Sequence, residues 1–314
     1  MLMIPTGVLC AAEWERHVIT EGGFTFTVVA ADFTGDGKMD VISSPRGKVV
    51  LYEAPSWKPR MIHEFEGGRK NCIHSEAFDV DGDGDQDYVG AFGHGSPFWL
   101  ERPDSVDEPW TYRVIDPDVS RAHCVLKADI NKDGKLDLLI NQFSPEGKVA
   151  NSLLWLEVPE DVKAAPHWTR HILADQDAVG GSHYFGFGDI DGDGWGEVAI
   201  GAKGKPFENG NWFSYWKNPG ADEVNAPWAK VLIADEQEGA TNIAIGDLNG
   251  DEKPDFLASL GHGKGVVWFE APSWKRHVID AEMECPHSLV LADLDGDGDL
   301  DGASCGFKSQ RVSV

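Results

Sequence analysis

The sequence predicts an all-β propeller of six four-stranded blades, and three observations lead to this prediction. An acidic nine-residue loop recurs six times along the 314 residues, four short apolar or aromatic runs accompany each copy, and 36 glycines and 17 prolines supply turns. Four strands repeated about every 50 residues are typical of a propeller blade. A single blade cannot bury both of its faces, so the copies are expected to pack around a common axis.

The recurring loop begins with Asp and ends with Asp or Glu at its ninth position, and successive copies start 47, 50, 60, 58 and 46 residues apart. Positions 1, 3, 5 and 9 carry carboxylates or carboxamides in nearly every copy, and glycines at positions 4 and 6 let a tight loop wrap an ion. We therefore predict structural calcium sites at Asp32, Asp36 and Asp40; Asp79, Asp81, Asp83 and Asp87; Asp129, Asn131, Asp133 and Asp137; Asp189, Asp191, Asp193 and Glu197; Asp247, Asn249, Asp251 and Asp255; and Asp293, Asp295, Asp297 and Asp301.

An EF-hand is the competing interpretation of these loops, and it requires Glu at the twelfth position with a helix on each side. The flanking runs alternate as strands do, and the twelfth positions are Ser43, Gly90, Ile140, Ile200, Ala258 and Ser304. The EF-hand is therefore excluded. Weaker binding is expected in two loops, because Thr34 stands at a ligand position and Glu252 stands where glycine is expected.

The four runs of a repeat follow one order. The first precedes the loop (288–292), the second follows it (88–92), the third is aromatic and ends in an acidic residue (98–101), and the fourth begins with Trp (274–279). Residues 14–19 match a fourth strand without the other three, whereas the last repeat has three strands and no fourth. We expect the N-terminal strand to close the last blade, which removes an exposed sheet edge. Seven blades are the alternative if the natural chain continues past Val314.

The formal net charge of −26 excludes a nucleic-acid binder, because phosphate backbones require a basic surface. No apolar run approaches the roughly 20 residues of a membrane span. Residues 1–12 are interpreted as the remnant of a secretory leader before a single propeller domain, 13–314. Loops of this kind fill at millimolar calcium, so we expect a secreted, periplasmic or cell-surface protein. The spacing of the four later cysteines fixes no pairing, and buried free thiols are an equal alternative: Cys72, Cys124, Cys285 and Cys305.

Histidines recur at one position of the repeat, six residues before the loop, as His123, His183 and His287. This position begins the innermost strand, so it lies at the mouth of the central channel opposite the loops. His94 and His262 stand in turns that return to the same mouth, and His74 lies one residue out of register. Converging imidazoles favour a transition metal, namely zinc, manganese, iron or nickel, and we predict His123, His183 and His287 as its ligands. Three cations also fall near this mouth (Arg121, Lys203 and Lys205), whereas three histidines of fourth strands are expected on the outer surface (His17, His171 and His277).

The six loops, together with Gly90-Ala91 and Gly201-Ala202, resemble the repeats of FG-GAP or VCBS propeller proteins. The resemblance extends over nearly the whole chain from Trp14. It implies a propeller with calcium loops on one face and leaves the function open, because such propellers include both adhesion modules and sugar-active enzymes.

Two functions follow for the histidine mouth. The arrangement is similar in kind to the propeller of aldos-2-ulose dehydratase and to oligogalacturonate lyases, which implies a metal-dependent carbohydrate lyase or dehydratase acting by β-elimination. The candidate bases are His74, His94, His262 and Tyr184. The alternative is a non-catalytic module that binds a glycan or a protein on the aromatic platforms Trp99, Trp212 and Trp216. A purely structural scaffold is a third interpretation.

Overall fold

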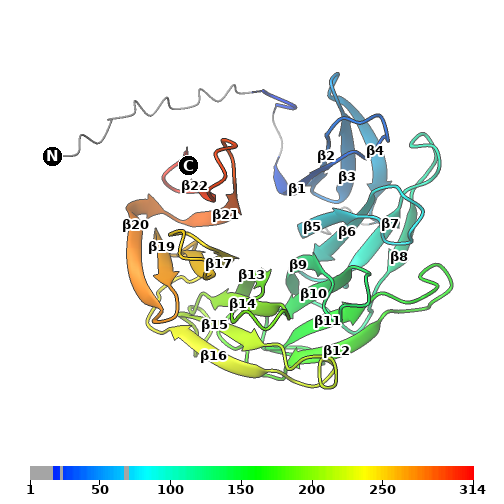
Figure 1. Ribbon diagram of the computed structural model, residues 1–314. Coiled ribbons are helices and arrows are strands. Elements are labelled where there is room, and N and C mark those ends of the chain that lie inside the picture. The colour runs from blue at the N-terminus through cyan, green and yellow to red at the C-terminus, as the bar shows by residue number, and fades with distance from the viewer. Residues whose placement is uncertain (1–16, 22–23, 67–70) are drawn as a thin grey trace.

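Six antiparallel β-sheets stand side by side around a common axis, which Figure 1 views end on. The computed structural model describes residues 17–21, 24–66 and 71–314. The first three blades consist of β1 (Thr25–Ala31), β2 (Asp40–Pro45), β3 (Lys48–Glu53) and β4 (Lys58–Glu64); β5 (Cys72–Phe78), β6 (Asp87–Phe92), β7 (Phe98–Glu101) and β8 (Thr111–Val114); and β9 (Ala122–Ala128), β10 (Asp137–Gln142), β11 (Leu153–Glu157) and β12 (Thr169–Ala174). The last three consist of β13 (Ser182–Gly188), β14 (Glu197–Ala202), β15 (Trp212–Lys217) and β16 (Ala229–Ala234); β17 (Asn242–Gly246), β18 (Asp255–Ser259), β19 (Lys264–Glu270) and β20 (Lys275–Glu284); and β21 (Pro286–Ala292), β22 (Asp301–Gly306) and β23 (Arg311–Ser313).

The predicted six-bladed architecture is confirmed. Strands that are neighbours in the sequence pair within each blade, so every blade is a simple meander. First strands line the centre of the ring, and first strands of neighbouring blades contact one another. Second strands are the most buried elements, and all six residues of β6, β10 and β14 are buried. Each acidic loop joins a first strand to a second, as predicted, so all six loops lie at the same end of the channel.

The hydrophobic core is divided into five clusters, one for each interface between neighbouring blades. A Trp stands directly before each fourth strand of the first five blades, and from the second blade onward its side chain contributes to these clusters. Trp110, Trp168 and Trp228 each pack into the cluster shared with the preceding blade. Burial of a Trp side chain is worth roughly 3–5 kcal/mol against Ala, so these residues fasten successive blades together. Trp57 of the first blade, with no preceding blade beside it among the described residues, remains partly exposed.

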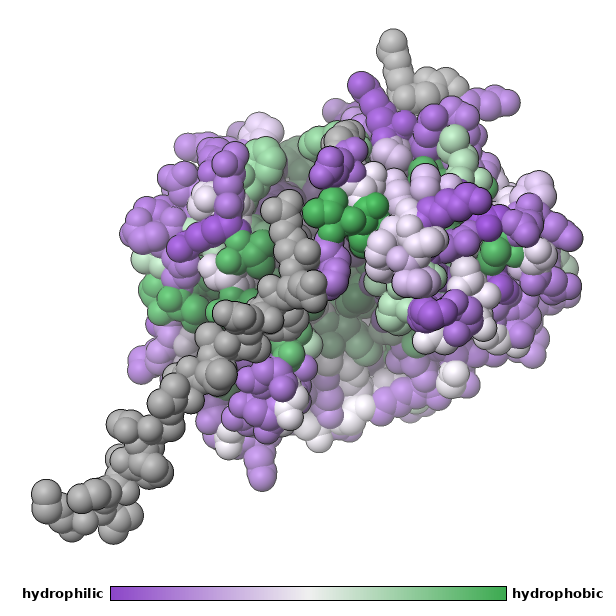
Figure 2. All heavy atoms as spheres, turned by 90° about the horizontal axis from the view of Figure 1, so that it is seen from above, coloured by the Kyte–Doolittle hydropathy of each residue, from purple (hydrophilic) through white to green (hydrophobic). Residues whose placement is uncertain are grey.

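The first and last blades face each other across an opening in the ring (Figure 1). The sixth sheet has three strands, residues 17–20 form no strand, and residues 14–16 of the expected closing strand lie outside the described residues. Apolar side chains on both sides of the opening are exposed, including Val28 and Val312 at 55% and 73%. Figure 2 shows this side of the molecule, where apolar residues gather between two hydrophilic flanks.

Two further expectations concern cysteines and membranes. The four cysteines of the described residues are free, and Cys72 and Cys124 are buried, so the interpretation as buried thiols holds for these two. No helix in the described part of the chain is long and apolar enough to cross a bilayer.

Candidate functional site

Three histidines converge at the mouth of the channel opposite the acidic loops. The Nε2 atom of His262 lies 2.8 Å from Nε2 of His183 and 3.1 Å from Nε2 of His287. They come from three blades, because His183 stands near the start of β13, His262 in the turn between β18 and β19, and His287 near the start of β21. We call these residues the histidine triad. Two of the three predicted ligands, His183 and His287, belong to it, and His262, predicted as a base, is its third member.

His183 is held in one tautomer. Its Nδ1 lies 2.9 Å from the carbonyl oxygen of Gly181, and because a carbonyl only accepts, Nδ1 carries the proton. Its Nε2 therefore presents a lone pair to the other two rings. This is the arrangement by which proteins orient a metal-ligating imidazole. Burial of the fully enclosed ring, followed by the charge of His123, lowers the pKa of His183 well below its usual value.

The other two triad rings also favour the neutral form. Desolvation, followed by the charges of Lys203 and His287, lowers the pKa of His262 to about 4, although this side chain is open to solvent on one side. Burial and the charge of Lys203 likewise lower the pKa of His287. Neutral imidazole is the form that binds metals, so at neutral pH the triad offers nitrogen ligands without first losing protons.

A close contact between two glycines positions His262. The backbone N–H of His262 donates to the carbonyl of Gly239 at 3.1 Å. Gly239 has φ of +79°, and a Cβ atom on it would lie 2.3 Å from the nitrogen of Gly263. Only glycine fits there, so the turn that carries His262 is pressed against the neighbouring loop in one position.

His123, the third predicted ligand, lies beside the triad and outside the group of three converging nitrogens. Its ring stacks on Phe143 at 4.4 Å and meets the ring of His183 edge-on at 4.6 Å. Burial, followed by the charge of His287, lowers its pKa to about 3. Asn141 fixes this corner, because its side chain accepts the backbone N–H of His123 at 2.9 Å and donates to the carbonyl of Ser182 at 2.7 Å in the next blade.

The remaining predicted bases occupy three different settings. His74 lies in the channel wall, where Nδ1 accepts the backbone N–H of Val125 at 3.4 Å, Nε2 faces the sulfur of Cys124 at 3.7 Å, and burial lowers the pKa to about 4. Tyr184 lies centrally, with its ring 5.2 to 5.8 Å from the rings of His74, His123, His183 and His287, and burial raises its pKa. His94 is exposed at the rim of a neighbouring pocket.

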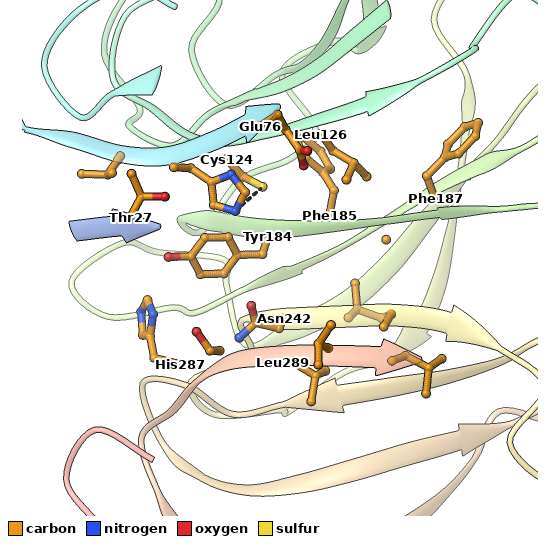
Figure 3. Close-up of a pocket in the computed structure, with 18 of the residues that line it drawn as sticks. Thr27, Glu76, Cys124, Leu126, Tyr184, Phe185, Phe187, Asn242, His287 and Leu289 are labelled. Atoms are coloured by element: carbon orange, nitrogen blue, oxygen red, sulfur yellow. Dashed lines mark hydrogen bonds between the residues drawn. The ribbon is translucent and has the colours of Figure 1, made fainter. Parts of the chain in front are cut away.

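The channel itself is a cavity of about 750 Å³ lined by all six first strands. Figure 3 shows Thr27, Tyr184 and His287 toward one end of it and Phe187 toward the other. Glu76 projects from β5 into the same cavity, and burial raises its pKa to about 7, with a smaller opposing effect of Lys127. Glu76 was not predicted from the sequence, although a Glu within a first strand, where apolar residues prevail, was an available signal.

Lys203, which the sequence placed near this mouth as a cation only, lies against the aromatic rings of the site. Its Nζ atom is 5.4 Å from the centre of the Phe143 ring and 5.7 Å from that of Phe207. Burial lowers the pKa of Lys203, and its charge acts on His123, His262 and His287. No carboxylate is among the charges that shift the pKa values of these three histidines. Glu146, which lines a neighbouring pocket with His123 and Phe143, is bound to Arg121 at 2.9 Å, so its charge is paired.

The predicted aromatic platforms are wrong. Trp99, Trp212 and Trp216 are 1%, 6% and 0% exposed and belong to the clusters between blades. Their place in third strands explains the error, because these strands pack their large side chains between sheets. The outer histidines His171 and His277 behave as expected: they stack on Trp155 and Trp268 and contact Glu157 and Glu270.

At the opposite mouth, the acidic loops hold their shape through backbone hydrogen bonds. In the second loop Asp79 accepts the N–H groups of Gly82 and Gly84 at 2.7 and 2.9 Å. The buried Asp87 at position 9 accepts Val80 N–H at 3.0 Å with one oxygen and Arg102 N–H at 2.7 Å with the other. The carboxylate at position 9 therefore links the loop to the end of the third strand through hydrogen bonds. Asp40, Asp137 and Asp255 repeat this pattern.

Three of the loops fit a calcium ion by the convergence of their carboxylates. Oxygen atoms lie within 4.8 Å of one another in three groups: Asp79, Asp81 and Asp87; Asp189, Asp191 and Glu197; and Asp293, Asp295 and Asp297. A lysine contacts one carboxylate in each of two groups: Lys163 lies 2.7 Å from Asp81, and Lys217 contacts Asp191. Carboxylate oxygens are the ligand type that calcium prefers, and three side chains would supply part of the six to eight oxygens that it takes.

Comparison with known proteins agrees with the fold. The FG-GAP-like repeat family matches residues 79–140 and 189–258. A lectin from Agrocybe aegerita, described as recognising non-reducing terminal N-acetylglucosamine, is similar over 82% of this chain and 66% of its own, with 14% identity and a TM-score of 0.52. BBS1N, solved in complex with ARL6DN, is similar over 92% of this chain and 78% of its own, with 9% identity and a TM-score of 0.55. Comparison with curated protein sequences found no match. With six meander blades, an acidic loop in each and the two matched segments, the chain is a β-propeller that contains FG-GAP-like repeats.

Proposed function

We propose that this propeller binds one transition-metal ion through the histidine triad and uses it to act on a carbohydrate held at the same mouth. The observation that carries the proposal is the convergence of three Nε2 atoms from three blades, with His183 oriented by the Gly181 carbonyl. Three histidine ligands leave coordination positions open, as catalytic metal sites do. Zinc, manganese, iron and nickel all suit imidazole.

The reaction that these residues suit best is β-elimination. A bound metal would supply Lewis acidity that makes the C–H bond next to a sugar carbonyl or carboxylate more acidic. A base then takes that proton, the electron pair of the C–H bond forms a C=C bond, and the C–O bond at the β carbon breaks. The departing oxygen takes the C–O electron pair and a proton. No oxidant or reductant is needed.

The residues beside the triad can carry the two proton transfers. His123 lies against His183, and no described residue hydrogen-bonds to its ring nitrogens, so it is placed to accept the proton. The hydroxyl of Tyr184 faces the cavity and can protonate the departing oxygen (Figure 3). General acid–base catalysis of this kind contributes about 10²- to 10⁴-fold in rate.

The proposal is tested by metal analysis of protein purified without chelator. We expect about one transition metal per chain, lost in a variant with His183→Ala and His262→Ala and retained in the matched outer variant with His171→Ala and His277→Ala. Formation of an unsaturated sugar is then followed by its absorbance, with the metal-free variant as the blank. Absence of a transition metal from the unaltered protein rejects the proposal.

A non-catalytic glycan-binding module is the second candidate. The fold shared with a sugar-recognising lectin and the wide channel favour it, whereas the burial of all three expected Trp platforms counts against stacking at those residues. A glycan that binds the metal-loaded protein and is recovered unchanged would favour this candidate over the enzyme.

The acidic loops are proposed to bind structural calcium. The three convergent carboxylate groups support this, and the remaining loops share their backbone hydrogen bonds around position 1. Sites that fill at millimolar calcium favour a secreted, periplasmic or cell-surface location.

A further inference from the structure

The histidine mouth contains a cation without an anionic partner. No described carboxylate lies within 4.0 Å of the Lys203 ammonium, which instead rests against the rings of Phe143 and Phe207. Of the other two cations near this mouth, Arg121 already binds Glu146 at 2.9 Å and Ser144, and Lys205 is exposed. In two of the acidic loops, by contrast, Lys163 and Lys217 are bound to carboxylates.

We infer that Lys203 binds an anionic group of the substrate, and that the substrate is a carboxylated sugar such as a uronic acid. Phe143 connects the two parts of the site, because its ring stacks on His123 at 4.4 Å, meets His183 edge-on at 5.1 Å and lies under the Lys203 ammonium. A bound metal at the triad and Lys203 would together present two positive centres to one ligand. In a protein of net charge −26, two neighbouring positive centres of this kind would favour an anionic ligand.

The aromatic setting makes this cation selective for an anion. An ammonium beside two rings is partly removed from water, so a charged partner gains more from it than a neutral hydroxyl does. The adjoining cavity of about 750 Å³ leaves room for the sugar rings that carry the carboxylate, and its Thr, Asn and Tyr side chains can hydrogen-bond to hydroxyls. This inference rests on the proposed function, since it names the substrate class of the same mouth.

The test compares charged sugars with their neutral counterparts. Calorimetric titration of the metal-loaded protein with glucuronate and glucose, and with galacturonate and galactose, is expected to give at least tenfold tighter binding of one uronate. Lys203→Met should weaken that binding about tenfold and leave the neutral sugars unchanged, and Lys203→Arg should retain most of it. Lys205→Met is the matched control, because Lys205 is exposed two residues away in the same turn.

Neutral sugars that bind as tightly as uronates, or equal effects of the Lys203 and Lys205 variants, overturn the inference. The metal content of each sample is measured alongside. Equal sugar affinities with one metal per chain reject the anion site and leave the metal proposal standing. A preference for uronate that depends on Lys203 in protein without metal supports the anion site and rejects the metal proposal.

Discussion

The two mouths of the channel are built from the same repeat and differ in almost every chemical respect. At the loop mouth, carboxylates from every blade accept backbone N–H groups and bind lysines, as Asp87 and Asp81 do. At the histidine mouth, neutral imidazoles face one another and Lys203 has no carboxylate beside it among the described residues. The loop mouth pairs most of its polar groups within the protein, although Asp85 Oδ1 and Glu197 Oε1 have no hydrogen-bond partner among the described residues. The histidine mouth leaves nitrogen lone pairs and one charge for a ligand.

This difference follows the repetition of the sequence. The loops occur in all six blades and share one hydrogen bond, from the backbone N–H at position 6 to the Asp at position 1, as expected of parts that each blade needs in order to fold. The triad comes from three blades and two different places in the repeat, namely first strands and a turn. A feature that occurs in only some blades is not required for a blade to fold, because the other blades fold without it. Its chemistry is therefore the better guide to function.

The largest expected effect is at position 9 of the loop mouth. Asp87→Ala should lower the free energy of unfolding by about 3 kcal/mol, even with calcium chelated, because two backbone N–H groups lose their acceptor in a buried place. Denaturant unfolding in chelator measures this. Asp83→Ala, which changes an exposed carboxylate of the same loop, should cost under about 0.5 kcal/mol there. Equal losses of unfolding free energy in the two variants would contradict the role of position 9 in linking the loop to the third strand.

The next prediction compares a Gly→Ala change at a left-handed glycine of each mouth. Gly239→Ala should weaken metal binding at least tenfold and destabilise the fold by about 2 kcal/mol, since the new Cβ would meet the turn of His262. Gly250→Ala is the control, because Gly250 has a similar φ of +76° with nothing within 4 Å of the new atom. It should leave the metal at the histidine mouth in place. The comparison is made by titrating each variant with metal, and equal metal affinities would remove Gly239 from the positioning of the triad.

Calcium should act on one mouth alone. Ten millimolar calcium is expected to raise the free energy of unfolding by about 2 kcal/mol for each loop that it occupies, which corresponds to a dissociation constant of about 0.3 mM per site. The variant with His183→Ala and His262→Ala should gain as much. A variant with Asp293→Asn and Asp297→Asn should gain less, because it loses one of the three convergent groups. If the histidine variant instead loses the calcium effect, the assignment of calcium to the loops fails.

The sequence predicted the blades, the loops and the histidine mouth because each depends on local patterns repeated several times. It placed His183 and His287 together through their shared register and found His262 through its turn. It could not assign His262 and His123 to their roles, because which ring meets His183 depends on Gly239 pressing against Gly263 and on Asn141 joining two blades. The Trp platforms failed for a related reason: a Trp in a strand can face solvent or a neighbouring blade, and only the packing of the ring decides.

The smallest expected effect lies between the mouths, at Glu76. Burial raises its pKa from 4.5 to about 7, so the folded protein holds a proton there that the unfolded chain has lost, and stability falls as the pH rises from about 4.5 to 7. Glu76→Gln removes that penalty. Its gain in free energy of unfolding should be about 1 kcal/mol larger at pH 8 than at pH 6.3, as measured by urea unfolding. Glu282→Gln, an exposed carboxylate bound to Lys264, should show no such difference. A gain that does not depend on pH would mean that Glu76 is ionised in the folded channel, and the channel would then carry negative charge between the two mouths.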